Sequence, residues 1–104
     1  MGTGFDEFYR EIEAEAQAEG PAAVADLRAK ELKYQLINSL LTRRRQLHWT
    51  QGELAAKSGV AQEEISRIER GRKSPNMDTY ARLASVMDLG VVVRRPRRRR
   101  VQVA

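Results

Sequence analysis

The sequence predicts an all-α fold built around two short helices joined by a tight turn. Residues 50–71 read TQGELAAKSGVAQEEISRIERG, in which Thr50 and Glu53 have the spacing of a capping box. Each side chain of such a pair bonds a free backbone N–H of the other residue, so a helix is expected to begin at Gln51. Gly59 can adopt a positive φ and end that helix, and isoleucines at helical spacing then indicate a second one.

Two short helices held at a sharp angle can place the second in the major groove of B-DNA while the first contacts the phosphates. The segment matches TQ, LA, G-V, IS and E-G of the pattern TQxxLAxxxGVxxxxISxxExG, and it resembles the Xre/Cro-type helix-turn-helix family over roughly residues 34–89. The resemblance implies a lambda-repressor-like helix-turn-helix domain of the five-helix type that binds DNA.

An amphipathic helix is expected at the amino terminus. Phe5, Phe8, Tyr9 and Ile12 recur at helical spacing, and glutamates occupy the opposite side. A Gly-Pro pair at residues 20–21 ends this helix and suits the start of the next. The domain therefore carries an amino-terminal helical extension.

A long second helix follows over residues 22–46, either unbroken or bent near Lys30. Arg44 falls on its apolar face, and Glu69 points toward the core from the second motif helix. The two residues form a structural ion pair, as the family resemblance also implies, or Arg44 extends to solvent.

Asn76 can cap a further helix, which Gly90 would end. The β-branched Val91–Val93 could then form a short carboxy-terminal strand. Six arginines follow within the last eleven residues, and this tail either contacts phosphates or is a solvated end. The residues expected on the inward face of the last helix are Met77, Tyr80, Leu83, Ala84 and Met87.

Charge divides the chain into parts. The net charge of +5 is the sum of −5 over residues 1–31 and +10 over residues 32–104. We therefore expect an acidic helical arm for partner binding at 1–31, a helix-turn-helix DNA-binding domain at 32–90, and the short strand with a basic Arg-rich tail at 91–104. A basic body suits a polyanion, and the acidic arm suits a partner of the opposite sign.

Composition excludes several classes. The chain has no cysteine and one histidine, His48, which excludes a zinc finger and disulfides and argues against a metal site, a cofactor and an enzyme. No run approaches the length of a membrane span, and the amino terminus lacks signal-peptide features. A cytoplasmic protein with no membrane partner is expected.

Helix-turn-helix geometry places the first turns of the second motif helix against base edges. Gln62 suits a bidentate contact with adenine and Arg67 one with guanine, each contributing about 1 to 3 kcal/mol of discrimination. Glu63 either accepts a bond from cytosine or pairs with Arg67. Gln51 resembles the family position that holds a phosphate. The expected DNA contacts are Gln51, Gln62, Glu63, Ser66, Arg67, Lys73, Ser74 and Asn76.

The alternative for these residues is an ordinary solvated helix face. Two departures from the family pattern also bear on stability, since Ala61 lacks the hydroxyl of a usual cap and Gly52 weakens a first helical turn. Both suggest a domain that gains part of its stability from dimerisation or DNA. Trp49 directly precedes a helix cap and is expected to pack as a hydrophobic staple rather than stack on a base.

The overall layout resembles HigA-like antitoxins of toxin-antitoxin modules. That resemblance implies a homodimer that binds a palindromic operator as an autorepressor and neutralises a RelE/HigB-like ribonuclease toxin. The expected toxin contacts are Phe5, Phe8, Tyr9 and Ile12. The alternatives are a stand-alone Xre-type transcriptional regulator with no toxin partner, whose arm packs on its own core, and an interaction module that does not bind DNA.

Overall fold

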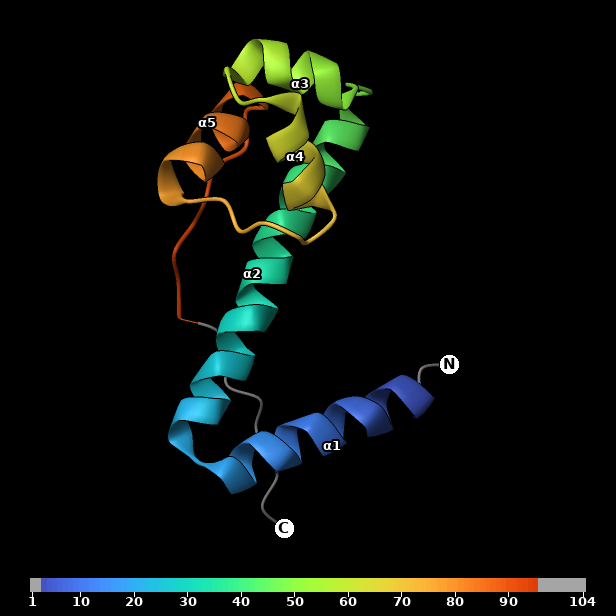
Figure 1. Ribbon diagram of the computed structural model, residues 1–104, viewed down its shortest axis with the longest axis vertical. Helices are drawn as coiled ribbons and strands as arrows, with labels where there is room; N and C mark the ends of the chain where they lie inside the picture. The colour runs from blue at the N-terminus through green and yellow to red at the C-terminus, as the bar shows by residue number, and fades with distance from the viewer. Residues whose placement is uncertain (1–2, 96–104) are drawn as a thin grey trace.

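The computed structural model describes residues 3–95, which contain five helices and no strand (Figure 1). The molecule measures 53 × 30 × 24 Å, and it is elongated because one long helix extends beyond the group formed by the last three (Figure 1). The prediction of an all-α fold is confirmed. In chain order the helices are α1 (Thr3–Glu19), α2 (Pro21–Gln46), α3 (Gln51–Ser58), α4 (Gln62–Glu69) and α5 (Met77–Val86).

Helix α2 runs past Lys30 without a break, so the unbroken alternative holds (Figure 1). Before it, Gly20 has a φ of 115°, a conformation that favours glycine. The proline that follows occupies the first turn, where its missing N–H costs no helical hydrogen bond. The second half of α2 carries Ile37 and Leu40 into the core.

The hydrophobic core lies between the second half of α2 and helices α3, α4 and α5. Each of these helices contributes side chains that are almost fully buried, which fixes their mutual orientation. Trp49 packs partly buried against this core, as expected of a staple, and the Lys57 ammonium lies 4.9 Å from the centre of its ring. The buried set is Ile37, Leu40, Leu54, Val60, Ile65, Ile68, Leu83, Ala84 and Met87.

Helix α5 begins at the predicted cap, because the Asn76 carboxamide oxygen accepts a 2.8 Å hydrogen bond from the Thr79 N–H. Arg43 Nε donates to the Met87 carbonyl oxygen at 2.7 Å and ties α2 to the carboxyl end of α5. The inward position predicted for Met77 is wrong, since its side chain is 86% exposed. Met77 is the first residue of α5. It has the helical spacing of the core residues, but it lies beyond the edge of the core.

The short strand that the sequence suggested at Val91–Val93 is absent from the described residues. These valines are 55%, 84% and 93% exposed, and no second strand is present in residues 3–95 to pair with them. A strand needs a partner for its backbone hydrogen bonds, so β-branched composition alone was not sufficient. The expected arginine tail lies mostly outside the described residues.

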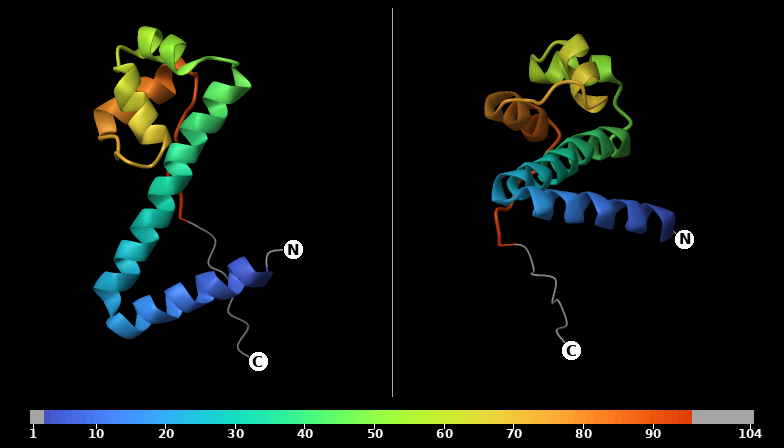
Figure 2. Two further views of the ribbon diagram at one scale, coloured as in Figure 1. Left: turned by 45° about the vertical axis from the view of Figure 1, so that its right-hand side comes forward. Right: turned by 60° about the horizontal axis from the view of Figure 1, so that its bottom comes forward.

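The acidic arm forms a helical hairpin in which α1 packs against the first half of α2, away from α3–α5 (Figure 2). Ala16 is buried in this contact, and the Tyr9 hydroxyl donates to the Glu31 carboxylate. Arg28 lies 3.4 Å from Glu13 and bridges the two helices. The boundary expected between residues 31 and 32 falls inside α2, so arm and domain share one helix.

Candidate nucleic-acid interface

The turn between α3 and α4 has the local structure that its sequence dictates. Glu53 N–H donates to the Thr50 hydroxyl at 3.0 Å, and Thr50 N–H donates to the Glu53 carboxylate at 3.1 Å, which completes the predicted capping box. Gly59 ends α3 with a φ of 75°. Ala61 then starts α4 in an extended conformation with no side-chain cap, as its sequence implies.

Helix α4 is anchored by one face and exposed on the other. Ile65 and Ile68 are each 1% exposed and pack into the core. Gln62, Glu63 and Arg67 are exposed and Ser66 is half-buried on the remaining surface. The isoleucines therefore fix the direction in which this polar face points.

The polar face of α4 forms one wall of a concave surface with a volume of about 770 Å³. Helix α3 contributes Gln51, and Gly52 lies against the Gln62 side chain, since a Cβ at residue 52 would be 3.5 Å from Gln62 Oε1. We call this the α3–α4 concave surface. It is lined by Gln51, Ala61, Gln62, Glu63, Ser66, Arg67, Arg70 and Arg72.

This surface unites five of the eight residues predicted to contact DNA. The other three come from the loop before α5 and do not line it. Lys73 lies 3.4 Å from Glu64, Asn76 caps α5, and Ser74 is exposed.

Arg70 and Arg72 also line the α3–α4 concave surface, although neither was predicted to contact DNA. Gly71, between them, has a φ of 73°, which turns the chain directly after α4. Arg70 also lies three residues after Arg67 and so near it on the helical surface. That spacing was a signal available in the sequence.

The sequence left open whether Glu63 pairs with Arg67. Within residues 3–95 no ion pair of 4 Å or less joins the two side chains. The Glu63 carboxylate is exposed at the first turn of α4, where the positive end of the helix dipole favours a negative charge. The pairing alternative is therefore not realised in the free chain.

Arg44 and Glu69 form a largely buried ion pair next to this surface. Arg44 Nε and Nη2 donate to the two carboxylate oxygens of Glu69 at 2.7 and 2.8 Å, and Arg44 Nη1 donates to the Trp49 carbonyl oxygen at 2.7 Å. The hydrogen bond to Glu69 raises the pKa of Arg44, and burial opposes this effect. The guanidinium is therefore charged at any pH near neutrality.

The same ion pair reaches the interface through Gln51. The Gln51 amide nitrogen donates to Glu69 Oε1 at 2.9 Å. The Glu69 carboxylate therefore orients Gln51, which is expected to hold a phosphate. An amide nitrogen has two donors, which leaves the second for another acceptor. The ion pair thus connects the core with the first turn of α3.

The acidic arm presents the four residues expected to contact a toxin in two ways. Phe5 and Phe8 are 70% and 58% exposed on α1. Tyr9 and Ile12 are half-buried, and the ring of Tyr9 stacks with that of Phe5 at a centroid distance of 6.4 Å. The exposed part of the stripe is therefore at the free end of α1.

Residues 3–95 show neither a metal-binding cluster nor a helix able to span a membrane. No cluster of three or more His, Cys, Asp or Glu side chains could hold a metal ion in this part of the chain. Among the helices described, none combines the length and the apolar character needed to cross a membrane.

The fold and the α3–α4 concave surface define a DNA-binding protein of the helix-turn-helix class. The HTH_3 model, described as helix-turn-helix, matches residues 40–92, and the chain belongs to this Xre-type family. A relative from Haemophilus influenzae, described as an uncharacterized HTH-type transcriptional regulator, is 34% identical over 83 residues, which cover 80% of this chain and 76% of the relative. No solved structure matches the chain.

Proposed function

We propose that this chain is a sequence-specific transcription regulator that binds a palindromic operator as a homodimer and represses its own operon. The observation that carries the proposal is the α3–α4 concave surface, which gathers amide and guanidinium groups around the exposed face of α4. Amides and guanidinium groups are the side chains that make bidentate contacts with adenine and guanine. The relative's description as a transcriptional regulator supports the same function.

The proposal gives different roles to different parts of the surface. Gln62 and Arg67 contact base edges, because both are exposed on the polar face of α4, Gln62 at its first residue and Arg67 in its last turn. Arg70 and Arg72, which also line the α3–α4 concave surface, contact phosphates. Gln51 contacts a phosphate with the amide N–H that is not bonded to Glu69. Lys73, Ser74 and Asn76 lie farther along the loop as supplementary phosphate contacts.

Titration of operator and scrambled duplexes tests these roles. Arg67→Ala should lower the ratio of operator to scrambled affinity by roughly 5- to 150-fold, because about 1 to 3 kcal/mol of discrimination is lost. Gln62→Ala should act in the same way. Arg10→Ala is the matched control, since Arg10 is an exposed arginine on α1. If Arg67→Ala and Arg10→Ala changed that ratio equally, α4 would not be the recognition helix.

Salt dependence provides a second, independent measurement. When binding neutralises phosphates, the logarithm of the association constant falls linearly with the logarithm of the salt concentration. The slope is about −0.9 for each phosphate contacted. A salt-insensitive affinity in the micromolar range or weaker for every duplex would favour the alternative of an interaction module that does not bind DNA.

We further propose that the acidic arm binds and neutralises a RelE/HigB-like ribonuclease toxin. The support is the exposure of Phe5 and Phe8 on an acidic helix that lies apart from α3–α5 (Figure 2). A basic ribonuclease presents a cationic surface that acidic residues complement, and exposed aromatics are frequent anchors of such interfaces. Tyr9 and Ile12 are half-buried on the same helix and complete the proposed contact surface.

Removal of residues 1–19 separates this proposal from a stand-alone regulator. The deletion takes away α1 but leaves α2 and the buried core intact. The shortened protein should keep operator binding and lose capture of a purified RelE-like ribonuclease encoded beside it. If the full chain failed to bind that ribonuclease, and the deletion destabilised the domain, the stand-alone regulator would be favoured.

A further inference from the structure

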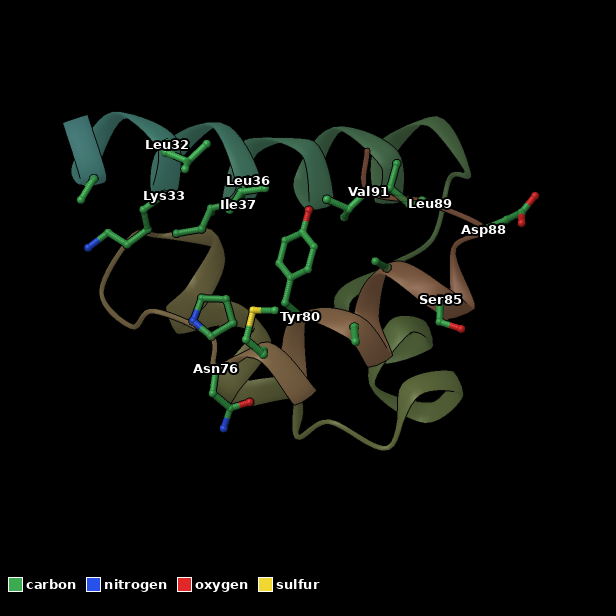
Figure 3. Close-up of a pocket in the computed structure, with 16 residues that line it drawn as sticks. Leu32, Lys33, Leu36, Ile37, Asn76, Tyr80, Ser85, Asp88, Leu89 and Val91 are labelled. Atoms are coloured by element: carbon green, nitrogen blue, oxygen red, sulfur yellow. The ribbon is translucent and has the colours of Figure 1, made fainter. Parts of the chain in front are cut away.

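A second large concavity lies between α2 and α5. It has a volume of about 1080 Å³, and Leu32, Leu36 and Ile37 line it from α2 (Figure 3). Tyr80 of α5 extends toward these side chains, and Val91, which follows α5 in the chain, also lines the concavity (Figure 3). We call this feature the α2–α5 groove. Its lining is mostly apolar.

The rim of the α2–α5 groove exposes large apolar side chains to water. Leu32 is 57% exposed, Met77 86% and Val91 55%. The chain continues from the groove into Val92 and Val93, which are 84% and 93% exposed. Single exposed apolar residues are ordinary, but a contiguous group of this kind marks an interaction surface.

One charge of each sign lies at the ends of the groove. In Figure 3, Lys33 is at one end and Asp88 at the other. Neither makes an ion pair of 4 Å or less with another of residues 3–95, and the Lys33 ammonium instead lies 5.7 Å from the centre of the Tyr34 ring. A surface that matches the groove is therefore apolar along its length. It carries a negative charge opposite Lys33 and a positive charge opposite Asp88.

A second copy of this chain has that pattern. In a two-fold contact whose axis runs across the groove, perpendicular to its length, the two grooves are antiparallel and Lys33 of each copy faces Asp88 of the other. A strongly basic partner would match Asp88 but would repel Lys33. The charge arrangement thus favours self-association over a cationic protein.

The groove is also compatible with DNA binding. Its lining shares no residue with the α3–α4 concave surface and includes no residue of α1, and Asn76 is the one proposed DNA contact that also lines it. The principal DNA contacts on α3 and α4 and the arm are therefore separate from the groove in the residues they use.

We propose that two copies of this chain associate groove to groove through α2 and α5, with Lys33 of each opposite Asp88 of the other. Val91–Val93 of each copy then covers the apolar rim of the opposite groove. The inference specifies the interface of the proposed homodimer, and its biological use in operator binding rests on the proposed function. The association itself does not require DNA.

Sedimentation equilibrium of the full chain without DNA tests the interface. The wild-type protein should be a dimer, and Met77→Asp should weaken dimerisation by at least about tenfold because it places charges in an apolar contact. Met77 is 86% exposed in the single chain, so this variant should keep its fold. Lys30→Asp is the matched control on α2, since Lys30 is exposed and does not line the groove.

Charge reversal makes the test specific to the two-fold geometry. Lys33→Asp and Asp88→Lys should each weaken self-association by at least about tenfold, since each places like charges opposite one another. An equimolar mixture of the two single variants should form a heterodimer, and the double variant should dimerise again.

Each adverse result has a distinct meaning. A monomeric wild-type protein at about 100 µM, or a dimer unaffected by Met77→Asp and both reversals, would overturn the groove interface. Operator binding would still be open to measurement in either case. A dimer that responds as expected but binds no DNA would instead overturn the proposed function and leave the interface standing.

Discussion

Removal of the Glu69 carboxylate should be among the most destabilising single changes in this domain. Arg44 makes two short hydrogen bonds to Glu69, and the two side chains are only 13% and 8% exposed. Glu69→Ala leaves the guanidinium with the Trp49 carbonyl as its one remaining protein acceptor in the described structure, and it removes the acceptor of Gln51. An unpaired, largely buried charge is the dominant cost of this substitution.

The magnitude follows from the exposure of the pair. Breaking a fully buried ion pair costs about 3 to 5 kcal/mol. Because some water reaches Arg44, we expect the lower end, about 3 kcal/mol of unfolding free energy. In a chain of this length that corresponds to a fall in Tm of about 12 to 24 °C.

Urea unfolding followed by circular dichroism measures this cost. Glu64→Ala is a matched control, because it removes a glutamate from the same helix whose partner Lys73 is 3.4 Å away and 46% exposed. That exposed pair should contribute less than about 1 kcal/mol. Equal destabilisation by Glu69→Ala and Glu64→Ala would refute the reasoning.

A double substitution distinguishes the net contribution of the pair from the cost of leaving one charge alone. Arg44→Met with Glu69→Leu should recover most of the stability lost in Glu69→Ala, since no buried charge remains. The pKa of Arg44 is raised in the folded state, so its contribution is complete below the unfolded pKa and is lost only as pH rises through the folded pKa, far above neutrality. Between pH 6 and 8, titration of Arg44 should therefore leave the measured cost unchanged.

The remaining predictions concern caps and rim residues. Ala61→Ser should stabilise the protein by about 1 kcal/mol and raise Tm by about 4 to 8 °C in a thermal scan, because Ala61 has cap geometry but no side-chain acceptor; a lower Tm would contradict this. Gly59→Ala should cost about 1 kcal/mol in urea unfolding, since the residue has a φ of 75° and a Cβ is disfavoured there; no loss would mean that the turn relaxes. Arg70→Ala and Arg72→Ala should each reduce the salt slope of DNA binding by about 1 with little change in sequence preference; an altered preference would indicate base contacts instead.

The parts of the fold that sequence predicts well are set by local rules. The capping box at Thr50 and Glu53 and the positive φ of Gly59 involve residues only a few positions apart. The spacing of charged residues on apolar faces also sufficed to bring Arg44 and Glu69 together as the paired alternative, although they are 25 positions apart in the chain. The start and end of each helix therefore required little information from beyond its own neighbourhood, whereas the ion pair required the faces of two helices to be compared.

The parts that sequence missed depend on where the core ends. Helical spacing treats Met77 like Leu83, but only the structure shows that one lies at the groove and the other in the core. The valines after α5 have strand composition without a strand to pair with. Likewise, Arg70 and Arg72 join the α3–α4 concave surface only because the chain turns at Gly71.

Helix α2 has a mechanical consequence for how two bound partners would be arranged. It contains 26 residues, so it is a rod of roughly 39 Å that supports α1 at one end and packs beneath α4 at the other. A protein bound to α1 would therefore be held at a fixed distance and orientation from the DNA, which a flexible linker would not achieve. Because α2 is unbroken, its length would set the separation between the two bound partners.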